Sequence, residues 1–219
     1  MATEDEKNKT IAVVTYPGVA LLDLVVTQTV LDRGTKYRAV SVGERTEPIA
    51  SDTPMAVVPE KRFEEVPHPS VLLVPGDRAS TFAAMGNEAI RSYVRSAAET
   101  AEVAGSICTG ALIVASVGLL EGRQATTHWV YCKILEQFGA KYVRKRWVED
   151  GKFISSAGVT AGIDMALHLA RPPGRHVRHK GRVEPGGSGD RGQTEADDQA
   201  KPMNPSEAWR DLTVPQTKQ

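Results

Sequence analysis

Residues 103–122 read VAGSICTGALIVASVGLLEG, and this stretch decides the fold that we predict for the chain. A short apolar segment leads to Cys108, and an apolar run that stops at Gly118 follows Thr109 and Gly110. The pattern predicts a strand, a tight turn and a helix, with a thiol at the turn. Backbone N–H groups at the start of a helix favour a thiolate, which makes Cys108 a candidate nucleophile. A small buried hydrophobic residue would fit the same local pattern equally well.

Strand-like and helix-like segments alternate on both sides of this stretch. Residues 10–16 (TIAVVTY) and 70–74 (SVLLV) are typical of buried strands, and each is followed directly by Pro-Gly. A further strand is expected at residues 37–42, and helical spacing of apolar residues is found at 20–31, 87–102, 129–138 and 158–170. This alternation predicts an α/β fold built on a doubly wound, mostly parallel sheet.

Two shorter features indicate hairpins. Residues 48–51 and 55–58 flank Asp52-Thr53-Pro54, and residues 143–148 and 153–156 flank Asp150-Gly151. Both intervening sequences are typical of turns, and Asp-Gly is a strong hairpin signal.

The ends of the chain differ in composition from its middle. Residues 1–9 are polar, and we expect them to be disordered. Residues 171–219 contain four Val or Leu, no Ile or Phe, and six each of Gly and Pro, too few apolar side chains to offset the entropy of ordering. We therefore predict one domain at 10–170 and a disordered tail at 171–219, in which only 204–212 (NPSEAWRDL) favours a helical turn.

The overall charge excludes several classes of function. Lys and Arg together number 27, as do Asp and Glu, so no strong field is available to bind nucleic acid or an anionic membrane.

Neither a signal peptide nor a membrane span is recognisable, and we expect a cytoplasmic protein. Cys108 and Cys132 lack CxxC spacing, and no histidine lies in a metal-ligand pattern, so we predict no metal site and no disulfide.

Polar residues follow three of the predicted strands. They are Asp23 in ALLDLVV, Asp77 in the Pro-Gly-Asp turn after SVLLV, and Cys108. The carboxyl ends of parallel strands meet at one sheet edge, where these groups can converge. A thiolate there would attack an electrophilic carbon, the N–H groups of Thr109 and Asp77 would hold the developing charge, and a carboxyl would move protons. From pattern alone, Asp23 is equally well explained as a solvent-facing residue at a helix start.

Four segments together resemble the ThiJ/PfpI superfamily of class I glutamine amidotransferase-like proteins, and within it the isonitrile hydratase type. They are PGVALLDLVV (17–26), VLLVPGD (71–77), SICTGALIVASVGLLEGRQATTHW (106–129) and GVTAGIDMAL (158–167). The resemblance implies a flavodoxin-like three-layer sandwich and a homodimer. It also implies that Cys108 is the nucleophile and Asp23 its acidic partner, that the amide and hydroxyl of Thr109 face the site, and that the loops at Gly76 and Gly158 shape it.

The same resemblance implies a reaction on a small-molecule substrate without a cofactor. The Cys108 thiolate adds to the isonitrile carbon, the Asp23 carboxyl helps to protonate the adduct and bring in water, and an N-substituted formamide leaves. The alternatives that we retain are a ligand-sensing domain, because the domain also resembles the amino-terminal part of AraC-type regulators, and an inactive relative. A redox or aldehyde-handling role also stays open, since low-pKa cysteines in this superfamily are readily oxidised.

This chain departs from the family pattern in three places. The family usually has Pro-Gly-Gly where Asp77 stands here, and Gly-Pro where this chain has Val26-Thr27, which is expected to narrow the pocket. After residue 170, family members continue the helix and add another packed helix, whereas this chain continues as RPPGRHVRHKGRVEPGGSGD.

Other residues invite a chemical role that we do not assign. His128 in ATTHW is best explained as a structural histidine that caps a helix or bonds beside Trp129. Cys132 is expected to be a packing residue, and Asp164 is expected to form a local polar contact.

Overall fold

The short hydrophobic strands of the sequence pair side by side in one sheet of seven. The structure, a computed structural model, describes residues 9–170. The strand order is β10-β11-β7-β6-β1-β2-β5, and every neighbouring pair is parallel except β10 with β11. These strands are β1 (Thr10–Val14), β2 (Arg38–Gly43), β5 (Lys61–Arg62), β6 (Val71–Val74), β7 (Val103–Ile107), β10 (Trp147–Asp150) and β11 (Phe153–Ser156).

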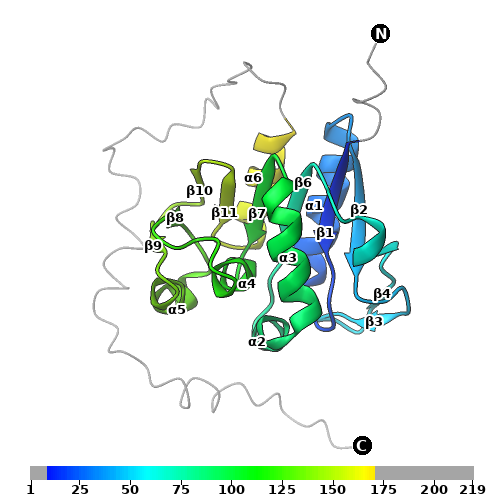
Figure 1. Ribbon diagram of the computed structural model, residues 1–219, viewed down its shortest axis with the longest axis horizontal. Coiled ribbons are helices and arrows are strands. Elements are labelled where there is room, and N and C mark those ends of the chain that lie inside the picture. The colour runs from blue at the N-terminus through cyan, green and yellow to red at the C-terminus, as the bar shows by residue number, and fades with distance from the viewer. Residues whose placement is uncertain (1–8, 171–219) are drawn as a thin grey trace, which may run out of the picture. The chain divides into compact units, whose positions relative to one another are not determined.

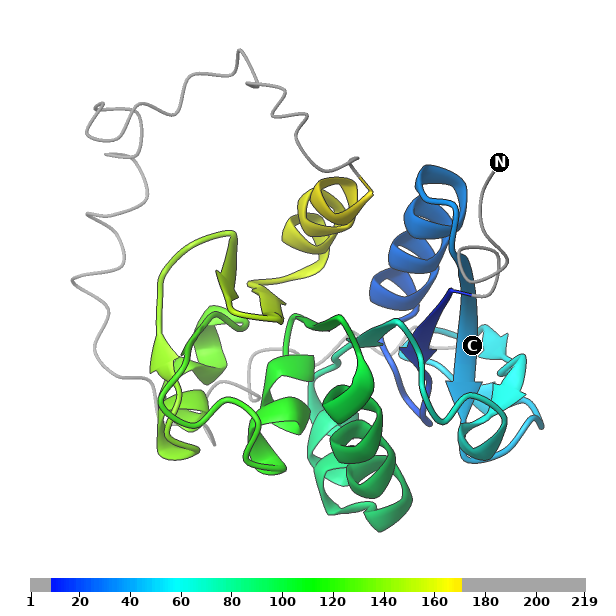
Figure 2. The same cartoon turned by 45° about the horizontal axis from the view of Figure 1, so that its top comes forward.

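Helices cover both faces of this sheet. They are α1 (Leu21–Gly34), α2 (Ala79–Gly86), α3 (Glu88–Thr100), α4 (Gly110–Ser116), α5 (Cys132–Gln137) and α6 (Val159–Leu169). Figure 2 shows α1 in blue and α6 in yellow on one face, with α3 and α4 in green on the other. The predicted three-layer α/β sandwich is confirmed, and its elements are labelled in Figure 1.

Central strands form the core because both of their faces are covered. All four residues of β6 are buried, as are four of the five in β1 and in β7. This agrees with the continuous apolar runs from which parallel strands were predicted. Strands β1 and β6 are neighbours although β2 lies between them in the sequence, so the strand order reverses at this pair. In doubly wound sheets such a reversal marks the usual position of a ligand site.

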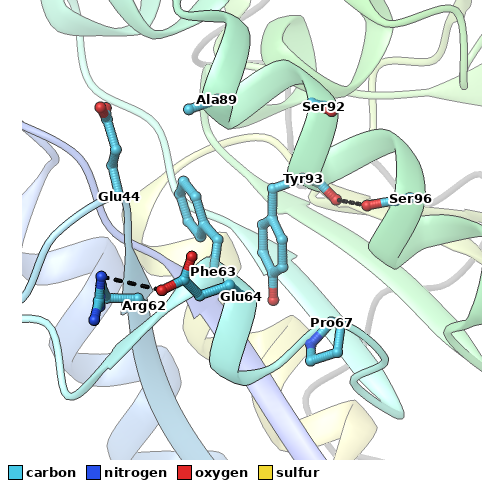
Figure 3. Close-up of a pocket in the computed structure, with 9 residues that line it drawn as sticks. All are labelled: Glu44, Arg62, Phe63, Glu64, Pro67, Ala89, Ser92, Tyr93 and Ser96. Carbon is cyan, nitrogen blue, oxygen red and sulfur yellow. Dashed lines mark hydrogen bonds and ion pairs between the residues drawn. The ribbon is translucent and has the colours of Figure 1, made fainter.

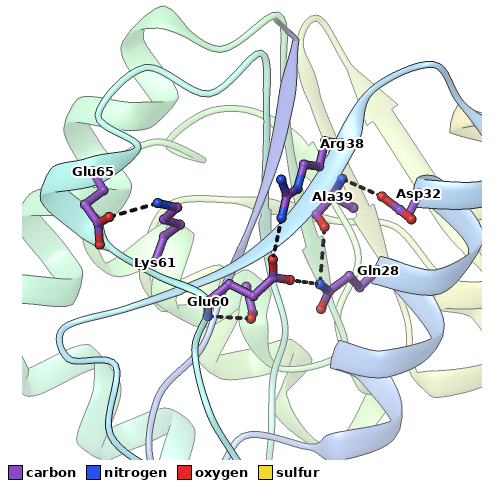
Figure 4. Close-up of polar contacts among 8 residues, drawn as sticks. Gln28, Asp32, Arg38, Ala39, Glu60, Lys61 and Glu65 are labelled. Carbon is purple, nitrogen blue, oxygen red and sulfur yellow. Dashed lines mark hydrogen bonds and ion pairs between the residues drawn. The ribbon is translucent and has the colours of Figure 1, made fainter.

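Side chains of α1 protect the edge of the sheet at β2, as Figure 4 shows. Strand β5 pairs only with Val42 and Gly43, which leaves the backbone of Ala39 without a partner strand on that side. The carboxylate of Asp32 accepts a hydrogen bond from the Ala39 N–H at 3.2 Å, and the Gln28 amide donates to its carbonyl at 3.2 Å. These bonds satisfy polar groups that would otherwise make an exposed edge.

Both predicted hairpins are present. Strands β3 (Ile49–Ala50) and β4 (Ala56–Val57) pair antiparallel, as do β10 and β11, whose turn residue Gly151 has φ of +64°. The helix expected at 129–138 begins instead as the 3-10 turn η3 (Trp129–Tyr131) and continues as α5.

The sequence did not indicate α2, the 3-10 turn η2 (Phe63–Glu65), β5, or the pair β8 (Gln124–Ala125) and β9 (Lys141–Tyr142). Two-residue strands are too short to show a period, and ASTFAAMG in α2 has little amphipathic pattern.

The predicted disorder of the tail at 171–219 and the turn at 204–212 lie outside the described residues, as does the predicted disorder of residues 1–8. Lys9 is described, and its ammonium pairs with Glu102 at 2.6 Å. Across residues 9–170, the helices are all too short or too polar to cross a membrane.

Gly110 supplies a test of how closely α4 approaches β6. A Cβ at this position would lie 2.0 Å from the carbonyl oxygen of Val74, whereas one at Gly86 would meet nothing within 4 Å. We expect Gly110→Ala to lower the free energy of unfolding by about 2–3 kcal/mol through overpacking. Gly86→Ala, the matched control in α2, should leave it unchanged or raise it by about 0.5 kcal/mol. Urea unfolding measures both, and equal effects would contradict the close approach.

Candidate active site

The predicted site residues lie on three loops at the carboxyl ends of adjacent parallel strands. Asp23 follows β1, Gly76 and Asp77 follow β6, and Cys108 follows β7. The β1 loop and the β6 loop are joined directly, because the Ala20 N–H donates to the Gly76 carbonyl at 2.9 Å. The sheet therefore brings together residues that are up to 85 positions apart in the sequence.

Cys108 occupies a strained turn between β7 and α4, which we call the elbow. Its φ is +55°, and it alone among the non-glycine residues at 9–170 has a positive φ. This left-handed conformation is costly for a side-chain-bearing residue and occurs preferentially at functional sites. The turn is held on both sides: the Cys108 N–H donates to the Ser156 carbonyl at 3.0 Å, and the Thr127 hydroxyl donates to the Cys108 carbonyl at 2.9 Å.

Asp23 is a buried carboxyl in the first turn of α1. The residue is 2% exposed, and neither carboxyl oxygen has a hydrogen-bond partner among the described residues. The Thr27 hydroxyl, one turn later, donates to the backbone carbonyl of Asp23 and not to its side chain. The solvent-facing alternative for Asp23 is therefore wrong. Buried carboxyl groups without partners are rare, and one at the carboxyl edge of a sheet is a candidate functional group.

Burial raises the pKa of the Asp23 carboxyl to about 7. The negative charges of Asp52 and Asp77 raise this pKa further. The nearby backbone N–H of Gly76 lowers it, although its distance and angle do not make a hydrogen bond with either carboxyl oxygen. Asp23 can therefore exchange a proton near neutral pH, which suits a general acid or base.

Burial also raises the pKa of the Cys108 thiol, to about 12. The negative charge of Asp23 adds to this effect, and the backbone N–H and hydroxyl of Thr109 oppose it. The sequence predicted the opposite direction, from the N–H groups at the start of a helix. That prediction is wrong because burial and the charge of Asp23 outweigh the hydrogen bonds from Thr109 at the start of the helix. The resting thiol is protonated and needs a base.

The Asp77 N–H, a predicted donor to substrate, is engaged within the protein. It lies 2.9 Å from the hydroxyl oxygens of both Thr81 and Thr109, and these two oxygens are 2.8 Å apart. The Thr109 hydroxyl donates to the Asp77 carbonyl, and the Thr109 N–H favours the Cys108 thiolate more strongly than this hydroxyl does. Of the two predicted N–H donors, Thr109 is thus the one directed at the thiol.

The two glycines implied by the family resemblance differ in their surroundings. A Cβ at Gly76 would lie 2.6 Å from the backbone nitrogens of Thr109 and Gly110, so only glycine allows the β6 loop to approach the elbow. A Cβ at Gly158 would meet nothing within 4 Å, and its φ of 172° is extended backbone that any residue adopts.

Three residues of this region were not singled out from the sequence. Tyr16 is buried, and its hydroxyl donates to the Pro75 carbonyl, directly before Gly76, at 3.0 Å. Burial raises the pKa of Tyr16, and so do the charges of Asp77, Asp23 and Cys108. Thr81 and Thr127 hold the β6 loop and the elbow. Only Tyr16 had a sequence signal, its position directly before Pro17-Gly18 at a strand end.

The remaining polar candidates have structural roles. The ring of His128 accepts a hydrogen bond from the Val130 N–H at the start of η3 and stacks on Trp129, as expected for a capping histidine. Asp164 pairs with Arg146 at 2.6 Å, which confirms a local polar contact. Cys132 is half-buried and begins α5. Within residues 9–170, no three His, Cys, Asp or Glu side chains are grouped so that they could hold a metal ion.

Hollows on the surface of the described residues lie outside this site. One, of about 390 Å³, lies between the η2 segment and α3, where Phe63 and Tyr93 stack with ring centroids 4.4 Å apart (Figure 3). The other, of about 300 Å³, includes Tyr16 and Pro17. Neither is lined by Cys108 or Asp23.

Comparisons with known proteins identify relatives of this fold. A family model described as the DJ-1/PfpI family matches residues 9–171. The isonitrile hydratase of Pseudomonas putida is 38% identical over 156 residues, 71% of this chain and 68% of that protein. The solved structure of a ThiJ/PfpI family protein from Pseudomonas syringae superposes with a TM-score of 0.72 at 32% identity, over 74% of this chain and 68% of the other.

A further similarity covers only a part of the chain. The HTH-type transcriptional regulator CdhR of Pseudomonas aeruginosa is 40% identical over 70 residues, 30% of this chain and 20% of that protein.

The raised pKa of Asp23 predicts how stability depends on pH. The folded protein binds this proton more tightly than the unfolded chain does, so stability is lost as pH rises from about 4 to about 7. The shift of about three units corresponds to about 4 kcal/mol at most. We therefore expect Asp23→Asn to raise the melting temperature clearly at pH 8 and little at pH 4. Asp164→Asn, which removes an exposed ion pair, should change stability by less than about 1 kcal/mol at either pH. A gain for Asp23→Asn that does not depend on pH would contradict the buried, proton-binding carboxyl.

Proposed function

The chain belongs to the DJ-1/PfpI family, and we propose that it is a cysteine-dependent hydratase of the isonitrile hydratase type. It would convert an isonitrile to an N-substituted formamide through a thioimidate on Cys108. One observation carries the proposal: a cysteine at a left-handed elbow stands beside a buried carboxyl, that of Asp23, which has no hydrogen-bond partner. The similarity to the isonitrile hydratase of Pseudomonas putida supports the choice of substrate.

The first step forms a carbon–sulfur bond. Because the Cys108 thiol is protonated at rest, the Asp23 carboxylate takes its proton as Sγ adds to the terminal carbon of the isonitrile. Asp23 then returns that proton to the same carbon, which gives a thioimidate, Cys108–S–CH=N–R. A pKa near 7 suits both halves of this transfer, since neither protonation state is costly at neutral pH.

The second step consumes water and releases the product. Water adds to the thioimidate carbon while its proton passes to the nitrogen, and the carbon–sulfur bond of the adduct then breaks. The sulfur leaves with the remaining hydroxyl proton, so Cys108 regains its thiol and R–NH–CHO departs. Asp23, at this edge of the sheet, would carry these protons as well.

Backbone donors would stabilise the charge that develops on sulfur and on the adduct. The hydrogen bond from the Thr109 N–H, which lowers the pKa of the Cys108 thiol, supports this role. The N–H of Asp77 would join it on leaving the hydroxyls of Thr81 and Thr109. Gly76 would keep these donors close to Cys108, and a part for Gly158 in shaping the site stays a prediction, as do the homodimer and the cytoplasmic location.

A ligand-sensing domain is the second candidate. The partial similarity to the transcriptional regulator CdhR favours it, and so does a resting thiol that is protonated. Such a domain would bind an isonitrile or a related small molecule without turnover, as would an inactive relative.

Turnover of a simple alkyl or aryl isonitrile tests the proposal. The purified protein should release the formamide, followed by absorbance or mass. Cys108→Ser and Asp23→Asn should each lower kcat/KM by at least about a hundredfold, because one removes the nucleophile and the other its base. Since the base form of Asp23 is required, kcat/KM should rise with pH through about 7.

Cys132→Ser is the matched control, because Cys132 is a second half-buried thiol away from the elbow, and it should retain full turnover. Absence of formamide from the intact protein would reject the hydratase. Isonitrile binding without turnover would then favour the sensing domain.

A further inference from the structure

The carboxylate of Asp77 is bonded to Ser80, three residues later in the chain. One of its oxygens accepts hydrogen bonds from the Ser80 N–H, at 3.2 Å, and from the Ser80 hydroxyl. The bond from the Ser80 N–H satisfies one of the free N–H groups in the first turn of α2, whose N-cap residue Arg78 makes no side-chain bond of this kind. The side chain that stands where the family usually has glycine therefore has a structural partner.

Ser80 carries this contact to the loop between β1 and α1. Its hydroxyl oxygen lies 2.7 Å from the Gly18 carbonyl, so that its one hydrogen is shared between Gly18 and Asp77. The two loops also touch, since a Cβ at Gly18 would lie 2.6 Å from both Cβ and Oγ of Ser80. The left-handed φ of +82° at Gly18 turns the loop toward this contact.

Asp77 is therefore connected both to the loop that precedes Asp23 and to the elbow at Cys108. Its carboxylate, through Ser80, holds the loop that ends in α1, whose first turn carries Asp23. Its backbone N–H and carbonyl bond the hydroxyl of Thr109, the residue directly after Cys108.

We propose that Asp77 is a positioning residue, which uses Ser80 to fix the Asp23 loop and its own backbone to fix the Cys108 elbow, so that carboxyl and thiol stay together. Its effect on turnover rests on the proposed function, whereas its effect on the β1–α1 loop does not. In this positioning role the side chain of Asp77 acts through Ser80, without contact to the reacting atoms.

The charge of Asp77 has a separate effect that the test must distinguish. It raises the pKa of Asp23 and of Cys108, in both cases as a smaller contribution than burial. Asp52 also raises the pKa of Asp23, and Asp23 raises that of Cys108. The hydroxyl of Tyr16 faces the charges of both groups, and that of Tyr131 faces Cys108. A change that keeps the hydrogen bonds but removes the charge isolates the positioning role.

Three variants separate these effects. Ser80→Ala removes the hydroxyl that bonds Gly18 and Asp77 and keeps the negative charge of Asp77. Asp77→Asn removes that charge and keeps an oxygen that can accept from Ser80. Asn87→Ala is the control, because Asn87 caps the neighbouring helix α3 through a bond to the Ile90 N–H and makes no bond to the site loops. Asn87→Ala should lower the free energy of unfolding by about as much as Ser80→Ala, without loosening the loop that precedes Asp23.

The first readout is hydrogen exchange at the amides of Gly18 and Ala20, which needs no substrate. Exchange in Ser80→Ala should be about tenfold faster than in the wild type, because the loop opens locally more often. In Asp77→Asn and Asn87→Ala it should match the wild type. Ser80→Ala exchanging at the wild-type rate would overturn the proposal, whether or not the protein hydrates isonitriles.

The second readout is turnover. In Ser80→Ala, kcat should fall by about tenfold or more, since a small misplacement of a catalytic group is costly. Its KM should stay within about twofold, and the rise of kcat/KM with pH should move below 7 as water reaches Asp23. Asp77→Asn should lose less kcat than Ser80→Ala, because it keeps the oxygen that accepts from Ser80, and its pH profile should report the loss of the Asp77 charge. A loss in Asp77→Asn equal to that in Ser80→Ala, or a pH profile of Ser80→Ala identical to that of Asn87→Ala, would overturn the positioning role.

Discussion

The carboxyl of Asp23 is held out of water at the first turn of α1, without a hydrogen bond to either oxygen among the described residues, beside the thiol of Cys108. Ionising such a group costs desolvation free energy, and the contacts around it do not fully compensate for that cost. The proton therefore stays bound up to about pH 7. The same burial keeps the thiol protonated. The site therefore stores a proton that can move between the two groups, and the account of its chemistry depends on that pair.

The fold maintains this arrangement through close backbone contacts. The elbow at Cys108 can form only where the β6 loop comes close to it, and Gly76 and Gly110 allow that approach because neither has a Cβ. Hydroxyl groups then hold the loops, from Thr127 on the elbow and from Thr81 and Thr109 on the β6 loop. Strain at Cys108 is thus supported by packing and hydrogen bonds around it.

The sequence predicted the sheet, its parallel strands and the three loops of the site, because apolar runs and Pro-Gly turns report local structure directly. Parallel strand ends then bring Asp23, Gly76 and Cys108 to one edge. What local patterns did not reveal depends on contacts between distant segments. Helix α2 lacks an amphipathic pattern, so the network of Thr81 with Asp77 was not foreseen. The predicted direction of the Cys108 pKa shift was wrong, because burial depends on the whole folded protein and not on the sequence of the turn.

Direct titration of the Asp23 carboxyl is the most direct test of this account. Carbon-13 NMR of aspartate-labelled protein, with the Asp23 signal assigned by its loss in Asp23→Asn, measures the midpoint without reference to any substrate. A midpoint near 7 is predicted. A midpoint near the ordinary aspartate value of about 4 would contradict the buried carboxyl as the proton carrier of the site.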